Sequence, residues 1–371
     1  MSMDDLYIGV MSGTSVDNVD LCAVDFKIHP PKIVAKYTHA IPVDLKKDIL
    51  DLCNLQTTNL QALTQLDAKL GVLFAEAVLA LLKCEKLSTK DIKAIGCHGQ
   101  TVYHGPRDML GVTLQLGDGN RIAALTNIIT INDFRRKDIA LGGEGAPLVP
   151  AFHQTLFHST ELDRAILNIG GMSNITLLHK ASDLVTGYDT GPGNVLLDTW
   201  VKKNLNLEYD ANGTWARTGK ICKVLLNKML EHPFLYLRPP KSTGRESFNA
   251  QWLLNLLSTS PEKLLPEDVQ NTLTHFTAKS IALGIEQSKL KKGEIIACGG
   301  GAYNCYLLEL ITTYLPSFRV KTSKAYDIEP EMIEPMAFAW LARQTMLKKT
   351  GNIPSVTGAN RKAILGAIYL P

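Results

Sequence analysis

The sequence lacks a stretch long enough to cross a membrane and a leader that would export the chain. Its longest apolar segment, residues 71–82, is interrupted by Glu76 and is shorter than the roughly 20 residues that a bilayer crossing requires. The first ten residues carry acids where a signal peptide carries Lys or Arg. The seven cysteines include no CxxC pair, which argues against a structural zinc site or a disulfide framework. We therefore expect a protein of the reducing cytoplasm, with most cysteines as small core residues.

Three widespread nucleotide-binding or kinase signatures are also missing. No GxxxxGK[ST] motif occurs, which excludes a P-loop enzyme, and no GxGxxG follows a strand with an acid about 20 residues later. The protein-kinase motif set is absent as well. The chain has 39 Lys and Arg against 36 Asp and Glu, and its net charge of +3 is spread along the sequence. No nucleic-acid or membrane surface is expected from such a distribution.

The composition is that of a folded protein with more than one domain. Hydrophobic residues make up 45% of the 371 positions and charged residues 20%, and no low-complexity linker interrupts them. A chain of this length usually divides into two cores. We place the boundary at the loop 141–150, which is rich in Gly and Pro, and expect a first domain of residues 1–148 plus 346–371 and a second of residues 149–345.

Each predicted half opens with a strand, a polar turn and a second strand. The first hairpin runs through 7–11, turns at 12–15 and resumes at 19–24. The second has strands at 164–169 and 175–178 around a Gly/Ser/Asn turn. This echo indicates an internal duplication at the level of structure. Further predicted strands are 91–97, 127–132, 184–188 and 294–297, and predicted helices are 63–82, 195–201, 272–288 and one from about 331. Alternating strands and helices predict α/β layers.

Four turns rich in glycine or hydroxyl side chains each follow an apolar strand: Ser12–Ser15, Gly170–Asn174, Asp189–Asn194 and Gly299–Gly301. Such turns let backbone N–H groups approach a phosphate, and a following helix adds its positive N-terminal end. A single turn of this kind is explained equally well by conformation alone. Four of them, two in matching hairpins, favour a nucleotide held in a cleft between domains.

Asp189 is the strongest candidate for a catalytic acid or base. It ends a predicted strand just ahead of a Gly-Pro-Gly turn, so its carboxylate could act as a base in a cleft. The alternative is that Asp189 caps the following helix or closes an Asx turn.

Several other polar residues are candidates for a functional role, some of them with a purely structural alternative. Asp17 and Asp20 flank the first hairpin and could hold Mg²⁺ through water, or could be ordinary turn acids. His98 and His104 bracket a predicted loop and are more typical of hydrogen-bonded structural groups than of metal ligands. Arg135 could bind a substrate carboxylate in a bidentate manner. The polar run 241–246 is either a loop over a site or a surface excursion.

The motifs, taken together, resemble those of the anhydro-N-acetylmuramic acid kinase family. They cover roughly residues 7 to 345, in order: GVMSGTSVDNVD (9–20), HGQTVYH (98–104), LGGEGAPLVPAFH (141–153), NIGGMSNIT (168–176), GYDTGPGN (187–194), KSTGRESFN (241–249), CGGGAYN (298–304) and EPMAFAWLA (334–342). The resemblance implies two ribonuclease-H-like domains, as in the actin-like ATPase and sugar kinase superfamily, with an ATP cleft between them.

The resemblance also implies a coupled reaction that consumes ATP with Mg²⁺. A base activates water to open the 1,6-anhydro bridge of the amino sugar, and the released O6 takes the γ-phosphoryl group. The products are N-acetylmuramic acid 6-phosphate and ADP. A cytoplasmic homodimer acting on this small molecule is expected, in recycling of the cell wall.

Carried onto this chain, the family pattern implies that Asp189 is the base. Arg135 is expected at the lactyl carboxylate and Glu334 at a sugar hydroxyl or amide. Further substrate contacts are expected from His98, Gln100 and Thr190. The expected ATP-binding residues are Ser12, Gly13, Thr14, Ser15, Val16, Asp17, Asn18, Val19, Asp20, Gly170, Gly171, Gly299, Gly300 and Gly301, with Asp17 and Asp20 near Mg²⁺.

Three positions depart from the family pattern. Asn18 replaces Gly in the hairpin, which is tolerable because Asn accepts left-handed geometry. Pro335 replaces a small residue, and it is tolerated in the first turn of a helix. Glu144 replaces Gln, and a carboxylate facing an anionic substrate would weaken its binding or change specificity. A kinase for another sugar and a catalytically silent nucleotide sensor are therefore kept as alternatives.

Overall fold

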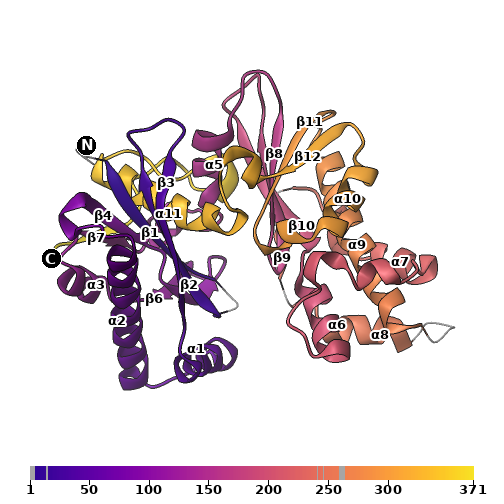
Figure 1. The fold of residues 1–371 in the computed structure, drawn as a ribbon, viewed down its shortest axis with the longest axis horizontal. Helices are drawn as coiled ribbons and strands as arrows, with labels where there is room; N and C mark the ends of the chain where they lie inside the picture. The colour runs from indigo at the N-terminus through magenta and orange to yellow at the C-terminus, as the bar shows by residue number, and fades with distance from the viewer. Residues whose placement is uncertain (1–4, 14–15, 240, 245, 259–263) are drawn as a thin grey trace. The chain divides into compact units, whose positions relative to one another are not determined.

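The structure is a computed structural model that describes residues 5–371 except 14–15, 240, 245 and 259–263 (Figure 1). The chain divides into two compact units: unit 1 comprises Met1–Leu156 and Glu331–Pro371, and unit 2 comprises Phe157–Pro330. The predicted boundaries at 148/149 and 345/346 differ from this division. Residues 331–345 lie in unit 1 because α11 (Ile333–Met346) packs on the strand β1 (Leu6–Ser12).

Unit 1 is built on a six-stranded sheet of order β13-β7-β4-β1-β2-β3. Strand β1 pairs antiparallel with β2 and parallel with β4, so the sheet changes from antiparallel to parallel pairing at β1. The bounds of the other strands are β2 (Asn18–Asp25), β3 (Lys32–Ala40), β4 (Ile92–Cys97), β7 (Thr130–Asn132) and β13 (Ala367–Tyr369). A separate hairpin of β5 (Gln100–Gly105) and β6 (Val112–Leu116) follows β4.

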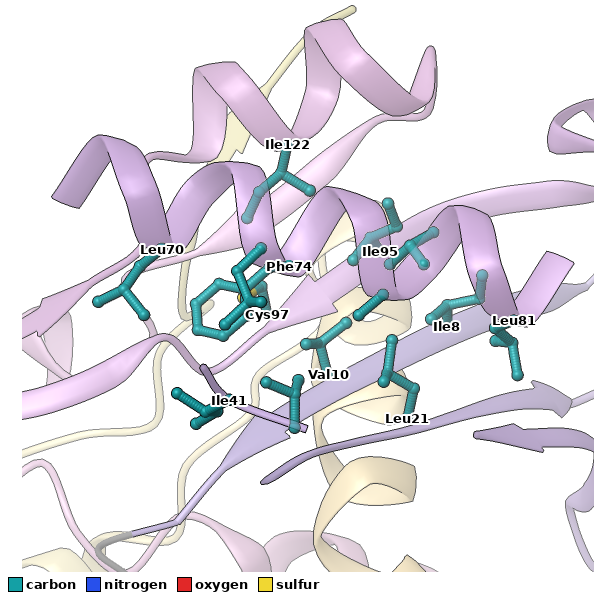
Figure 2. Packing of buried hydrophobic residues seen from close by; sticks show 14 of the residues in the cluster. Ile8, Val10, Leu21, Ile41, Leu70, Phe74, Leu81, Ile95, Cys97 and Ile122 are labelled. Atoms are coloured by element: carbon teal, nitrogen blue, oxygen red, sulfur yellow. The ribbon is translucent and has the colours of Figure 1, made fainter. Parts of the chain in front are cut away.

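Helices α2 (Leu60–Cys84) and α11 pack on the sheet of unit 1. The core includes side chains of α2 and of the sheet, and Figure 2 shows Phe74 of α2 beside Val10 and Cys97. Helix α11 approaches the backbone so closely that a Cβ on Gly9 would lie 1.7 Å from the Pro335 carbonyl oxygen. The remaining helices of this unit are α1 (Val43–Leu55), α3 (Gly119–Thr126), α4 (Arg136–Ala140), α12 (Pro354–Thr357) and most of α5 (Val149–Phe157).

Unit 2 contains a five-stranded sheet of order β10-β9-β8-β11-β12. Its strands are β8 (Arg164–Ile169), β9 (Met172–Leu178), β10 (Val185–Pro192), β11 (Gly293–Cys298) and β12 (Phe318–Thr322). The apolar core joins this sheet to α9 (Pro266–Gln287) and α10 (Cys305–Tyr314). A second cluster around Phe248 joins α9 to α6 (Val195–Leu205), α7 (Lys223–Leu230) and α8 (Ala250–Ser258).

Apart from β13, which pairs antiparallel with β7 and has no counterpart in unit 2, the two sheets share one strand order and one pattern of strand directions. Strands β3, β2 and β1 form an antiparallel meander that continues in parallel to β4 and β7, and β10, β9, β8, β11 and β12 repeat this arrangement. The duplication predicted from the hairpins is therefore confirmed, and so is the α/β class with two ribonuclease-H-like units.

Some local expectations were wrong. The loop predicted around His98–Thr101 is short, because Gln100 opens β5 and His104 lies within that strand. Asp189 does not end its strand, since β10 continues to Pro192. Pro335 does lie in the first turn of α11, as predicted. Among the residues that the structure describes, no helix is long and apolar enough to span a membrane.

Candidate active-site residues in the two units

The tip of the first hairpin in unit 1 is attached to β5. Ser12 closes the β1–β2 pairing opposite Val19, and its hydroxyl donates to Gln100 Oε1 at 2.6 Å. The Gln100 side-chain amide in turn donates to the Gly13 carbonyl oxygen at 3.4 Å. Gln100 therefore holds the turn that was predicted to contact phosphates. Two members of that turn, Thr14 and Ser15, lie outside the described residues.

Beyond the tip, the hairpin differs from the expectation in its backbone. Val16, and not Asn18, has the left-handed conformation, with φ of 56°. Asn18 is extended and pairs with Ala40 of β3. A β-branched residue at positive φ is strained, and the buried Val16 side chain anchors it in the core. Since the side chains of Val16 and Val19 are both buried, only their backbones are available to a ligand.

The carboxylates of Asp17 and Asp20 have different surroundings. Asp17 is exposed and forms an ion pair with Lys46. Asp20 Oδ1 accepts a hydrogen bond from Thr38 at 2.8 Å, and burial, with the charge of Glu331 in addition, raises the pKa of Asp20. Among the described residues no cluster of three or more His, Cys, Asp or Glu side chains could enclose a metal. Two carboxylates without further protein ligands are compatible only with a Mg²⁺ that keeps most of its waters.

His98 and Arg135 form a buried pair in unit 1. Arg135 donates from Nε and from one Nη to His98 Nε2, at 3.2 and 2.8 Å. Burial and the charge of Arg135 hold the pKa of His98 well below its ordinary value, so the ring is neutral and Nε2 accepts. Backbone hydrogen bonds with Gly99 and Ser12 counteract this shift in part, so the His98 ring lies against the first hairpin tip.

The guanidinium of Arg135 has an acid and a backbone carbonyl nearby. It donates to the Gly145 carbonyl oxygen at 2.9 Å. Burial lowers the pKa of Arg135 to about 10, and the negative charge of Glu334 counteracts this shift, so Arg135 stays protonated near neutral pH. His98, Arg135 and Glu334, which were predicted separately, therefore lie close together.

Glu144, the unusual acid of the boundary loop, is paired on the surface. Its Oε1 accepts from Nε and Nη2 of Arg107, at 2.9 and 2.7 Å. The ion pair offsets the charge that was expected to repel an anionic substrate.

In unit 2, Asp189 lies at an irregularity of β10. Asp189 pairs with Asn174 and Gly191 pairs with Ser173, so Thr190 is an extra residue and forms a β-bulge. A bulge reorients neighbouring side chains and is common beside active sites. The bulge also turns the Thr190 side chain into the core, where its hydroxyl donates to the Ser173 carbonyl oxygen at 3.2 Å.

The polar run after Pro240 holds the Asp189 carboxylate. Oδ2 accepts from the Thr243 backbone N–H at 2.9 Å and from the Ser242 hydroxyl at 3.1 Å. The Asp189 N–H donates to the Lys241 carbonyl oxygen at 3.1 Å. Lys241 is itself anchored by a hydrogen bond to the Leu235 carbonyl oxygen at 2.9 Å. The run therefore positions Asp189, although Arg245 within it lies outside the described residues.

The second hairpin tip is bonded to the start of α6. The Gly170 carbonyl accepts from Asn194 N–H at 2.8 Å, and the Gly171 carbonyl accepts from Gly193 N–H at 2.9 Å. Gly193 must remain glycine, because a Cβ there would lie 2.3 Å from the Gly170 oxygen. The nearby Ser173 hydroxyl is buried and has no hydrogen-bond partner among the residues described.

Gly299–Gly301 follows β11 and leads into the 3₁₀ turn Gly300–Tyr303. The protein's own packing explains Gly299 and Gly301, since an added Cβ would lie 2.3 Å from Asn168 Oδ1 or from Ile169 Cγ2. It does not explain three other predicted glycines. Among the residues that the structure describes, an added Cβ at Gly13, Gly171 or Gly300 would meet nothing within 4 Å, and none of the three has a left-handed φ. Glycines that the fold does not require fit the close approach of a ligand to their backbone.

The sequence interpretation missed several polar side chains at these positions. Ser242 and Thr243 lay in a run whose role was left open, and Ser173 lay in a turn judged by its glycines. Asn352 and Thr357, which both donate to the carboxylate of Asp138, were not identified, and neither was the structural role of Asp138. A short polar side chain within a buried pattern was the available signal at Thr357 and Asp138, but it did not indicate their partners.

Comparisons with known proteins identify the family of the chain. A family profile, anhydro-N-acetylmuramic acid kinase, matches residues 5–371. The chain is 50% identical over 372 aligned residues to a protein of that name from Saccharophagus degradans, covering 99% of each chain. It is 47% identical to one from Pasteurella multocida, covering 98% of this chain and 96% of the relative. Among solved structures, the activator of 2-hydroxyisocaproyl-CoA dehydratase from Clostridium difficile is a distant neighbour, with a TM-score of 0.46, 12% identity, and coverage of 94% of this chain and 99% of that one. On the full-length family match and the identity with these relatives, the chain belongs to the anhydro-N-acetylmuramic acid kinase family.

Proposed function

We propose that this kinase opens 1,6-anhydro-N-acetylmuramic acid with water and phosphorylates O6 in the same turnover. Water adds its hydroxyl to the anomeric carbon, the bond from that carbon to O6 breaks, and O6 takes the γ-phosphoryl group of ATP. One water and one ATP are consumed, and N-acetylmuramic acid 6-phosphate and ADP are released. The observation that carries this proposal is the full-length family match together with the fixed carboxylate of Asp189.

Asp189 is proposed to take the proton from the attacking water. Its Oδ2 is fixed by Ser242 and Thr243, which restricts how the carboxylate can turn. A base must lie within one hydrogen bond of the proton that it removes, and a held carboxylate meets that requirement at low entropic cost. The bulge at Thr190 supports the role because it sets the direction of the side chains beside it.

The two hairpin tips and the turn Gly299–Gly301 are proposed to hold ATP. Gly13, Gly171 and Gly300 support this assignment because their backbones are open to a ligand without a steric conflict within the protein. Backbone N–H groups at such turns offset phosphate charge. When Mg²⁺ is bound it supplies further charge neutralisation at the phosphates, and Asp20 is the carboxylate that we propose to hold it through water.

Arg135, supported by His98, is proposed to bind the lactyl carboxylate. A guanidinium matches a carboxylate in two parallel hydrogen bonds, and partial burial strengthens that contact. Glu334 is proposed at a sugar hydroxyl or amide, and Gln100 and the backbone of Thr190 at the rim of the sugar site.

The protein is proposed to work in the cytoplasm, as a homodimer. All seven cysteines are free, which suits a reducing compartment. The idea of a different sugar specificity rested on Glu144, whose charge is partly offset by an exposed ion pair with Arg107.

The test is incubation of the pure protein with ATP, Mg²⁺ and one sugar at a time. With the anhydro sugar, ADP release that depends on the sugar and a product carrying phosphate on O6 are expected. Phosphorylation of ordinary N-acetylmuramic acid, with the anhydro sugar untouched, would replace the proposal by a kinase of another specificity. ATP binding without turnover of either sugar would indicate a nucleotide sensor.

A further inference from the structure

Asp138 has a fully buried carboxylate that the proposed chemistry does not use. The residue lies in the short helix α4, just after Arg135, and its exposed fraction is 0%. Its three hydrogen-bond donors are neutral: Asn352 Nδ2 at 2.7 Å and the Thr357 hydroxyl at 2.8 Å to Oδ1, and the Gly145 N–H at 2.8 Å to Oδ2. A buried carboxylate is costly unless it is hydrogen-bonded, so it holds these three donors together in the folded protein.

The loop that carries Gly145 links Asp138 to Arg135, because Gly145 is hydrogen-bonded to both residues. Gly145 donates its N–H to Asp138 and accepts from Arg135 at its carbonyl oxygen, at 2.9 Å. Gly145 is left-handed with φ of +65°, and an added Cβ would lie 2.8 Å from Ile139. This geometry leaves the loop little freedom to move without displacing the guanidinium.

The other two donors come from a segment far along the chain, residues 351–363, which we name the tail segment. Asn352 also accepts from the Ala363 N–H at 2.7 Å, and the Thr357 carbonyl accepts from the Glu144 N–H at 2.7 Å. The Asn360 N–H donates to the Leu141 carbonyl oxygen at 2.8 Å. The tail segment is thus hydrogen-bonded to the loop that carries Gly145, at Leu141 and at Glu144.

We propose that Asp138, Asn352 and Thr357, the Asp138 cluster, position Arg135 for recognition of the substrate carboxylate. The cluster sets specificity for an acidic sugar over a neutral one without touching either. This inference rests on the proposed role of Arg135 in the function given above. It assigns that specificity to the tail segment, whose residues lie more than 200 positions from Asp138 in sequence.

The test compares two buried Thr→Val substitutions. Thr357→Val removes one donor to Asp138 Oδ1 with little change of shape. Thr126→Val is the control, because Thr126 is equally buried in unit 1 and its hydroxyl donates only within its own helix, to Ile122. Asp138→Asn is the stronger variant, in which an amide N–H₂ faces donors. Kinetic constants are measured with the anhydro sugar and with its analogue that lacks the lactyl group, taken as a substrate or as a competitive inhibitor.

In Thr357→Val we expect the KM for the acidic sugar to rise about tenfold, from the energy of a hydrogen bond to a charged group. Its kcat should stay within about twofold, and the constant for the neutral analogue should not change. A merely structural role would lower the active fraction, and so kcat, for both sugars alike. Thr126→Val should leave both KM values unchanged.

The outcomes separate this inference from the function on which it rests. If the unmodified protein does not phosphorylate the acidic sugar, the proposed function fails and the inference fails with it. If the unmodified protein does so but Thr357→Val matches Thr126→Val, or loses both sugars equally, the positioning role is overturned and the function stands. In folded Asp138→Asn the KM for the acidic sugar should rise further than in Thr357→Val, and an unchanged KM would likewise overturn the positioning role.

Discussion

Replacement of Asp189 by Asn tests the proposed base with little change of shape. The Asn side chain keeps a carbonyl oxygen that can still accept from the Thr243 N–H and the Ser242 hydroxyl, so the loop contacts at Oδ2 survive in weaker form. The change removes the negative charge and the ability to take a proton. Fold and nucleotide binding should therefore persist while the chemical step is lost.

The size of the effect follows from the role assigned to the carboxylate. A positioned general base accelerates a reaction by about 10²- to 10⁴-fold. Its loss raises the barrier by about 3–5 kcal/mol, at about 1.4 kcal/mol for each factor of ten. The exchange of two charge-assisted hydrogen bonds for neutral ones costs only about 1 kcal/mol of stability. The drop in rate should thus far exceed any drop in the folded fraction.

The assay measures ADP release at saturating anhydro sugar and the affinity for ATP by calorimetry. We expect kcat to fall at least about 100-fold, with the dissociation constant of ATP within about threefold. Glu231→Gln, an exposed acid-to-amide change in the same unit, is the matched control and should behave as the unmodified protein. A rate within tenfold of normal, or a loss of ATP affinity that accounts for the loss of rate, would refute the role of Asp189 as base.

Two further predictions concern the glycine turns and the stability of unit 2. Gly171→Ala should leave the melting temperature almost unchanged, because the added Cβ meets no described residue within 4 Å, but it should raise the KM for ATP. Gly193→Ala should lower the melting temperature, because the added Cβ would lie 2.3 Å from the Gly170 oxygen. Equal losses of stability in the two variants, measured by calorimetry, would contradict the role of Gly171 in ATP binding. Burial alone would raise the pKa of Glu294, but the hydrogen bonds from Lys321 and Tyr326 and the charges of Lys321 and Arg164 outweigh burial and lower it. A lowered folded-state pKa contributes stability above the ordinary value of 4.5 and loses it as the pH falls through the folded value. Glu294→Gln should therefore lower the free energy of unfolding by about 2–4 kcal/mol at pH 7, as measured by urea unfolding. In this variant the free energy of unfolding should also fall less steeply as the pH is lowered. A fall as steep as in the unmodified protein would show that Glu294 does not contribute.

Much of the fold was predictable, because both hairpins and the strands that follow them have recognisable patterns of apolar residues in the local sequence. Alternating apolar residues around small polar turns indicated β1–β2 and β8–β9, and a long apolar face indicated α2. The β5–β6 hairpin was missed because Gln100 and Thr101 read as a polar loop, whereas Gln100 is buried to hold Ser12 and Gly13. That burial is a tertiary requirement, and no local pattern records it.

The candidate site was predictable in its residue types more than in its geometry. Asp189 was identified from the turn that follows it, but the bulge at Thr190 depends on pairing with β9 and could not be read from β10 alone. Its partners Ser242 and Thr243 lie more than 50 positions away. The Asp138 cluster joins residues more than 200 positions apart, and no spacing rule reaches that distance.

The central claim is that water opens the anhydro bridge in the turnover that phosphorylates O6. The most direct test is a single short incubation with ATP, Mg²⁺ and the anhydro sugar in H₂¹⁸O, quenched before the product exchanges its anomeric oxygen. Mass spectrometry and ³¹P NMR then locate the label. We predict ¹⁸O on the anomeric carbon of N-acetylmuramic acid 6-phosphate and none in its phosphate group. Label in inorganic phosphate, or an unlabelled sugar phosphate, would contradict it.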